Sequence, residues 1–132
     1  MILGIDLGKS TTGIATSQGA FASPYKTLTH KSQKEALEKI SALIKEEGAE
    51  TIVIGFVEGK IKIFFENFAK NLKEKNPNVE IILWDETLTS RQAREYMVKQ
   101  NVPKLKRATK EHEVAAALIL QSYLDADNTS LL

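Results

Sequence analysis

The first part of the chain alternates short apolar runs with polar turns that contain glycine. The runs at 2–7, 13–16 and 20–23 are separated by the polar stretches GKST and SQG. Short apolar runs between turns of this kind are typical of strands joined as hairpins. We therefore expect three short antiparallel strands, with Pro24 closing the unit.

After this unit the spacing of the apolar residues becomes helical. In KSQKEALEKISALIKEEG they recur every three or four positions, and Gly48 is a suitable end for the helix. TIVIGF at 51–56 is a continuous β-branched run, which indicates a strand buried on both faces. We expect a second helix within about 62–74 and a second buried strand at 79–84 (VEIILW).

The last third of the chain is expected to be helical. Thr89, with Gln92 three residues later, resembles a capping box at the start of one helix. A final helix over about 109–125 has a VAAALIL centre that is apolar all round and is therefore expected in the interior. Alternating strands and helices imply right-handed crossovers and parallel pairing of the later strands. The predicted fold class is α/β: a five-stranded mixed sheet, three strands antiparallel and then two parallel, with helices on both faces.

Composition limits the size and location of this fold. A chain of 132 residues, 42% hydrophobic and 27% charged, fits one domain over residues 1–132. It has no cysteine, which excludes disulfides and thiolate metal sites. No apolar stretch reaches the roughly 18 residues that a membrane span needs. We therefore expect a cytoplasmic protein that makes no use of a membrane.

The distribution of charge says more than its sum. The formal net charge is only +1, yet no acidic residue occurs between Tyr96 and Lys110. A basic run of this kind suits a polyanion such as nucleic acid, although a solvated loop is the commoner explanation of a charge run. The candidate nucleic-acid-binding residues are Lys99, Lys104, Lys106, Arg107 and Lys110.

Carboxylates follow two of the expected strands. Asp6 lies near the end of the first strand, and Asp85 and Glu86 come directly after VEIILW. Sites in open sheets form beyond the carboxyl ends of parallel strands, so Asp6 and Glu86 would repel each other there unless a cation lay between them. Such oxygen ligands suit Mg²⁺ or Mn²⁺. Asp85 is more simply explained as a turn former, and Glu86 could be either a turn former or a metal ligand. Burying an unpaired charge at Asp6 would cost free energy, so a functional role is favoured there.

Five motifs, in order and spread over nearly the whole chain, resemble the YqgF family: GIDLGKSTTGIA, FASPYKTL, VIGF, DETLTSRQA and AAALILQSYLD. Members of that family are described as Holliday-junction resolvases and as nucleases that process the precursor of small-subunit ribosomal RNA. The resemblance implies a ribonuclease-H-like fold and a metal-dependent nuclease acting on structured RNA or branched DNA. It also implies acidic active-site residues in the first strand, in the DE-x-L-T motif and at the start of the final helix. The first two fall on Asp6 and Glu86.

The third acidic position of the family falls on His112. Placed one turn before Ala116, this histidine is expected on the side of the helix that packs towards the sheet. It is either a structural contact at the helix end or a third metal ligand and catalytic residue, and an imidazole would favour Mn²⁺ over Mg²⁺. Thr11 and Thr87 also stand where the family commonly has basic residues, and GFVEGK replaces a longer Gly-x-Pro loop.

Two other functions compete with a nuclease. A nucleic-acid-binding or scaffold protein with the same fold and a degenerate active site would explain His112, Thr11 and Thr87. GIDLG also resembles the first phosphate loop of the actin, chaperone and sugar-kinase superfamily, but the second phosphate loop and second domain of those proteins are missing. Whether the chain is a monomer or a homodimer stays open, because no dimer surface is evident in the sequence.

Overall fold

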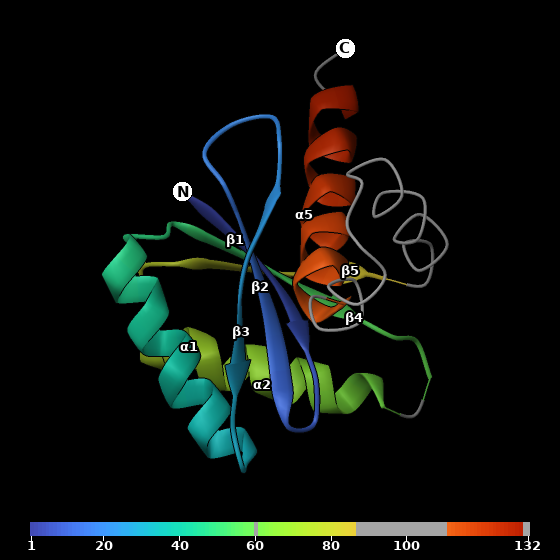
Figure 1. Cartoon of the computed structure of the whole chain (residues 1–132). Coiled ribbons are helices and arrows are strands. Elements are labelled where there is room, and N and C mark those ends of the chain that lie inside the picture. The colour runs from blue at the N-terminus through green and yellow to red at the C-terminus, as the bar shows by residue number, and fades with distance from the viewer. Residues whose placement is uncertain (60, 87–110, 131–132) are drawn as a thin grey trace.

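The computed structural model describes residues 1–59, 61–86 and 111–130, the last four as backbone only. The helix expected to begin near Thr89 and the basic run ending at Lys110 lie outside these residues. The elements, labelled as in Figure 1, are β1 (Ile2–Leu7), β2 (Thr11–Ser17), β3 (Ser23–Thr29), α1 (Gln33–Glu47), β4 (Thr51–Phe56), α2 (Lys62–Lys75), β5 (Glu80–Asp85) and α5 (Glu111–Ser130).

One sheet runs through the molecule in the strand order β3-β2-β1-β4-β5. Strand β1 pairs antiparallel with β2, and β2 pairs antiparallel with β3. Strand β4 pairs parallel with both β1 and β5. The mixed sheet predicted from the sequence is therefore confirmed, with β1 at its centre and the carboxyl ends of β1, β4 and β5 at one edge.

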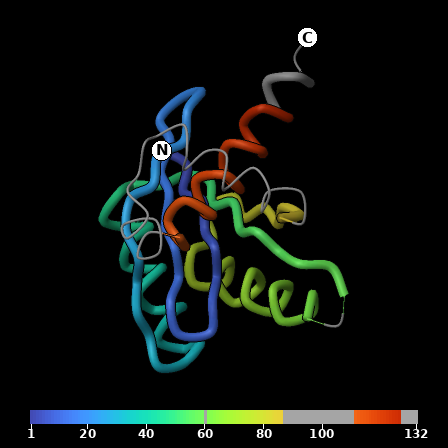
Figure 2. The backbone as a smooth tube through the Cα atoms, turned by 45° about the vertical axis from the view of Figure 1, so that its right-hand side comes forward, coloured from blue at the N-terminus to red at the C-terminus, as the bar shows by residue number. Residues whose placement is uncertain are grey.

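Helices cover both faces of the sheet. Helices α1 and α2 lie on one face and α5 lies across the other (Figure 1), and the turned view in Figure 2 shows the same three layers. Ile5, Ile40 and Phe68 belong to a large apolar cluster on the α1/α2 side. Val53 and Leu120 belong to a smaller cluster beneath α5. The apolar centre of the last helix is buried, as its sequence predicts.

Local sequence signals fix the ends of α1. Ser32 is the N-cap, and its side chain accepts a hydrogen bond from Glu35 N at 3.1 Å. Glu35 Oε2 in turn accepts from Lys31 N at 3.4 Å, so two donors at the helix start are satisfied reciprocally. Gly48 ends the helix in the left-handed region, with φ 65°. The end predicted at this glycine is confirmed, because glycine adopts that conformation without steric cost.

The third strand is the first correction to the sequence prediction. It runs from Ser23 to Thr29 rather than over 20–23, and Pro24 lies inside it instead of closing the unit. Strand β3 is at the edge of the sheet, where a proline without an N–H group is tolerated. Ile14 pairs with Lys26 and Ala15 pairs with Pro24, so Tyr25 is an extra residue that forms a bulge in β3. Polar residues interrupt the apolar ones along this strand, and a search for apolar runs therefore missed it.

The last strand is the second correction. VEIILW was expected to be buried on both faces, but β5 is the other edge strand of the sheet. Glu80 is exposed and the remaining residues of β5 are half-buried. The same kind of apolar run in β4 is buried throughout from Ile52 to Phe56, because β4 has a strand on each side. An apolar run alone does not distinguish these two positions.

Gly4 lets α5 lie close to the sheet. A Cβ atom at this position would be 2.7 Å from Leu120 Cβ and 2.8 Å from Ala116 O, so no larger residue fits without moving the helix. Within the part of the chain that the structure describes, no helix is long and apolar enough to cross a membrane.

Candidate active site

Asp6 occupies the centre of the sheet edge where the parallel strands end. It is the penultimate residue of β1, and its side chain is 19% exposed. Its partner in β2 is Gly13, and Gly55 lies beside it in β4, one position beyond the paired residues Ile5 and Ile54. The carboxylate thus stands between two positions that have no side chain, and neighbouring elements fill both.

The start of α5 lies directly against the first of these positions, Gly13. A Cβ atom at Gly13 would overlap the carbonyl oxygen of His112 and lie 2.8 Å from Glu113 N. The first turn of α5 therefore rests directly on the backbone of β2, beside Asp6. Any side chain at position 13 would push the start of the helix away from the sheet.

Two side-chain hydrogen bonds hold this first turn from opposite sides. His112 Nδ1 donates to Asp6 Oδ2 at 3.2 Å, and the imidazole is 45% exposed. Thr27 Oγ1 donates to Glu113 Oε1 at 3.2 Å. Thr27 pairs with Gly13 in the β2–β3 ladder, so the turn spans three strands, from β1 to β3. The expectation that His112 faces the sheet is confirmed.

The second open position accommodates Glu86. A Cβ atom at Gly55 would lie 2.7 Å from Glu86 Oε2 and would also overlap the side chain of Ile119. Glu86 N donates to Phe56 O at 3.0 Å, which continues the β4–β5 pairing one residue beyond β5. The glutamate side chain therefore crosses the end of β4 on the face that carries α5, in the direction of Asp6.

Both carboxyl groups hold their protons more strongly than free side chains do. Burial raises the pKa of Asp6, the nearby charge of Glu111 adds to this, and the hydrogen bond from His112 only partly opposes it. Burial also raises the pKa of Glu86 from 4.5 to about 7, with further contributions from the charges of Asp6 and Asp85. The site is therefore one where negative charge is crowded and partly desolvated.

The donor set agrees with a hard divalent cation, which two crowded carboxylates would attract. Asp6 and Glu86 supply oxygen ligands of the kind that Mg²⁺ and Mn²⁺ prefer. Within residues 1–59, 61–86 and 111–130, however, no three His, Asp or Glu side chains are grouped so that they could hold a metal ion. His112 is placed as the hydrogen-bond partner of Asp6, and Glu113 faces Thr27.

The remaining candidate residues are only partly placed. Thr11 begins β2 and is half-buried at the same edge of the sheet. Thr87 and the basic run ending at Lys110 lie outside the described residues. The sequence places Gly55 at the end of its strand, but it did not reveal that Gly13 and Gly55 leave space for α5 and Glu86, nor the Thr27 contact. The available signal was glycine in the interior of two apolar strands, which often marks a close approach by another part of the chain.

A family model described as "RuvX: Holliday junction resolvase" matches residues 1–126. The chain belongs to the RuvX family. This is the YqgF family indicated by the sequence motifs, so that recognition is confirmed. A RuvX relative from Acetivibrio thermocellus, provisionally named a pre-16S rRNA nuclease, is 36% identical over 95% of each chain. A protein of the same name from Syntrophus aciditrophicus is 38% identical over 95% of this chain and 88% of its own.

Solved structures confirm the ribonuclease-H-like fold expected for RuvX. RuvC from Thermus thermophilus in complex with a Holliday junction substrate superposes with a TM-score of 0.57 at 16% identity, covering 96% of this chain and 94% of RuvC. The fowlpox virus Holliday junction resolvase gives a TM-score of 0.62 at 12% identity, covering 95% of this chain and 98% of the viral protein. At these identities the likeness establishes the fold alone.

The raised pKa of Glu86 predicts that the contribution of this residue to the stability of the RuvX protein falls as pH rises. The unfolded chain releases the Glu86 proton near pH 4.5 and the folded chain near pH 7, so stability declines between these values and then levels off. The full shift corresponds to roughly 3 kcal/mol, which partial solvent exposure reduces to about 1–2 kcal/mol. Glu86→Gln should therefore raise the free energy of unfolding by about that amount at pH 8 and hardly change it at pH 4.

Urea unfolding of both proteins at the two pH values, in the presence of a chelator, measures this difference. Glu38→Gln is the control, since Glu38 is an exposed residue in the middle of α1. Equal stabilisation by Glu86→Gln at both pH values would show that the carboxylate is not destabilised by its surroundings.

Proposed function

We propose that this protein is a metal-dependent nuclease that hydrolyses phosphodiester bonds in nucleic acid, in pre-16S rRNA, in branched DNA such as Holliday junctions, or in both. The observation that carries the proposal is the convergence of Asp6 and Glu86 on one sheet edge beside the start of α5. Membership of the RuvX family and the names of its relatives support this reading.

Asp6 and Glu86 are the residues that would hold the metal. A divalent ion bound there would supply an activated water and charge stabilisation for the leaving oxygen. His112 holds Asp6 Oδ2 by its hydrogen bond and so fixes the orientation of the carboxylate at the centre of the site. Gly55 leaves space for the Glu86 side chain to approach the site over β4. We assign the catalytic roles to Asp6, Glu86 and His112.

Nucleic acid would also need contacts beyond the metal site. We assign these to the five basic residues between Lys99 and Lys110, because Lys110 directly precedes Glu111, the first residue of α5, in the sequence. Contacts of lysine and arginine with phosphates give affinity that falls with salt and carries little sequence preference. Binding of structured RNA or branched DNA should accordingly weaken steeply as ionic strength rises.

A second function competes, that of a nucleic-acid-binding or scaffold protein without catalysis. The observation that favours it is the engagement of His112 with Asp6, where the family has a carboxylate. A site with two carboxylates could keep the fold and the binding surface while binding metal too weakly to cleave.

A cleavage assay separates the two functions. The wild-type protein is incubated with a four-way DNA junction and with a structured RNA that contains the 5′ end of 16S rRNA, in Mg²⁺, in Mn²⁺ and in a chelator. Cleavage in either metal, abolished by the chelator, supports the nuclease. Binding of both substrates without cleavage in either metal favours the scaffold, and cleavage that persists in the chelator contradicts the metal dependence.

His112→Asp should increase the response of the protein to Mg²⁺. A third carboxylate restores the hard oxygen ligand of the family and crowds the site further, so the protein without metal should melt at a lower temperature. Added Mg²⁺ should then raise its melting temperature, and its cleavage rate, more than it does for the wild type.

His112→Asn is the matched control, because it removes the imidazole without adding charge. Thermal melting with and without Mg²⁺ gives a readout that does not depend on turnover. An unchanged response of His112→Asp to Mg²⁺ would make position 112 a structural contact of α5 only.

A further inference from the structure

The two edges of the sheet differ in how they are protected. Strand β3 contains Pro24 and a bulge at Tyr25, the extra residue between the partners of Ile14 and Ala15, and both features discourage pairing with another strand. Strand β5 has neither, since its six residues EIILWD pair with β4 in unbroken register. A straight apolar edge of this kind is a surface on which a further strand can be added.

Hydrogen bonds fix the direction of the β5 backbone groups. Glu80 N and Glu86 N both donate towards β4, at 2.9 and 3.0 Å. Successive residues of a strand direct their backbone N–H and C=O groups to opposite sides, so Ile81 and Leu83 present theirs at the outer edge. In the described part of the chain neither residue hydrogen-bonds on that side. Just before β5, the carbonyl of Val79 already accepts a hydrogen bond from Lys73 Nζ at 2.6 Å, so this group is occupied.

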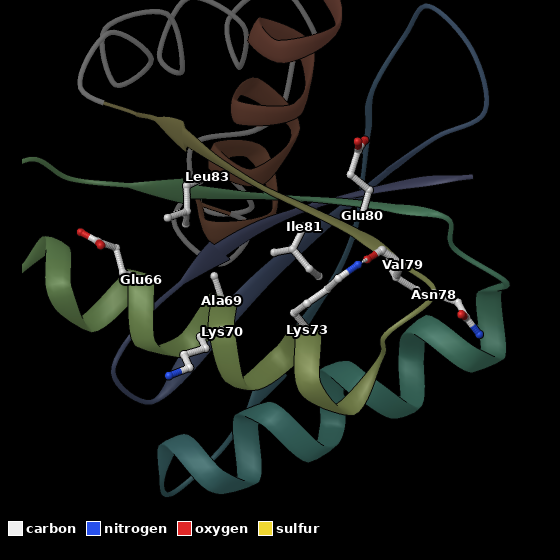
Figure 3. A pocket seen from close by; sticks show the side chains of 9 residues that line it. All are labelled: Glu66, Ala69, Lys70, Lys73, Asn78, Val79, Glu80, Ile81 and Leu83. Carbon is white, nitrogen blue, oxygen red and sulfur yellow. Dashed lines mark hydrogen bonds between the residues drawn. The ribbon is translucent and has the colours of Figure 1, made fainter.

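A groove runs beneath this edge, between β5 and α2 (Figure 3). It has a volume of about 690 Å³ and is lined by apolar side chains of β5 and by the charged face of α2. Ile81 and Leu83 point from the strand into it, and both are only partly buried against the core. Glu66 lies at the Leu83 end of the groove and Lys73 lies at the Val79 end.

We propose that two copies of this chain pair through β5, antiparallel to each other, about a two-fold axis at Ile82. This register places Ile81 opposite Leu83 of the second copy, and each such pair exchanges both backbone hydrogen bonds. In this register the outward N–H and C=O groups of Ile81 and Leu83 are hydrogen-bonded on both copies. The two five-stranded sheets then form one continuous sheet. Moving the axis by one residue, to Leu83, would place Glu80 opposite Glu86 of the second copy, which is unfavourable for two like charges.

The charges along α2 fit the same axis. A two-fold rotation at Ile82 reverses the groove, so the end that carries Lys73 meets the end that carries Glu66 of the second copy. Lys73 also comes near Asp85 of that copy, since Val79 is then opposite Asp85. Opposite charges thus meet at both ends of the interface, as a self-complementary surface requires.

The absence of cysteine from the chain makes the register directly testable. Ile82→Cys would place two thiols opposite each other at a pair without hydrogen bonds, with Cα atoms about 4.5 Å apart, which is compatible with a disulfide. Glu80→Cys is the matched control on the same strand, because its counterpart would be roughly 13 Å further along the second copy. Mild oxidation should link Ile82→Cys almost completely and leave Glu80→Cys unlinked.

Sedimentation equilibrium tests the pairing itself. The wild type should sediment at twice its chain mass of 14.7 kDa at high concentration. Leu83→Pro removes one outward N–H without disturbing the β4 ladder and should weaken the dimer at least about tenfold. Ile81→Lys, which places a positive charge in the groove directly beside the pairing edge, should do the same if the proline variant is poorly folded.

A wild type that stays monomeric, a dimer that survives both variants, or disulfides that form as readily at position 80 as at 82 would each overturn the proposal. Circular dichroism confirms that each variant is folded before its mass is measured. None of the variants changes Asp6, Glu86 or His112, so the outcome is independent of whether the site cleaves nucleic acid.

Discussion

Asp6→Asn protein is expected to bind structured nucleic acid as the wild type does and to cleave it at least about a thousandfold more slowly. The substitution removes one of the two charged oxygen donors from the centre of the site. The fold should be unaffected, because the asparagine oxygen can still accept the hydrogen bond from His112 Nδ1. Binding in a gel-shift assay and initial cleavage rates in Mg²⁺ and Mn²⁺, on the same preparation, measure the two effects separately.

Asp125→Asn is the matched control for this change. Asp125 accepts a hydrogen bond from Gln121 in the second half of α5, away from the start of the helix, so the same chemical change there should leave cleavage within about twofold of the wild type. Cleavage by Asp6→Asn at the wild-type rate would remove Asp6 from the mechanism. If Asp6→Asn lost binding and cleavage together, Asp6 would be needed for binding nucleic acid rather than for the cleavage step.

Gly13→Ala is expected to have the largest effect on stability among alanine substitutions of the seven glycines. The new Cβ would overlap the backbone carbonyl of His112, and a backbone atom cannot rotate away as a side chain does. Overpacking at such a position should lower the free energy of unfolding by about 2–4 kcal/mol. The displaced helix would also draw His112 away from Asp6, so we expect cleavage to fall by about a hundredfold in the protein that remains folded.

Gly19→Ala provides the comparison, since a Cβ there would meet nothing within 4 Å. Its stability should stay within about 0.5 kcal/mol of the wild type. Chemical denaturation of both variants gives the difference directly, and cleavage is measured well below the melting temperature of Gly13→Ala. Equal stability of the two variants would contradict the close packing of the first turn of α5 against Gly13 in β2.

Much of the fold follows from the spacing of apolar residues. The helix that ends at Gly48 and the buried centre of α5 are confirmed because each depends on a pattern within one segment. The parallel pairing of the later strands is confirmed because it follows from the alternation of strands and helices along the chain. The two errors concern the strands at the edges of the sheet. Strand β3 lacks an apolar run, and β5 has one without being enclosed, because position within a sheet depends on which strands lie alongside.

The candidate site shows the same division. Asp6 and Glu86 could be proposed from the rule that sites form at the carboxyl ends of parallel strands. The use of Gly13 and Gly55 as the two open positions beside Asp6 could not, because it depends on the distance of α5 and Glu86 from the sheet. That distance is a property of tertiary packing, and a glycine in the sequence only permits it.

The contact between His112 and Asp6 joins residues 106 positions apart in the chain. The helix that carries His112 also supplies most of the apolar cluster on its face of the sheet. During synthesis, the five strands and the first two helices emerge from the ribosome before α5, so Asp6 remains without its partner until α5 has emerged. The candidate site is therefore completed only after the whole sheet has been made, and a product truncated before α5 would carry the sheet without His112.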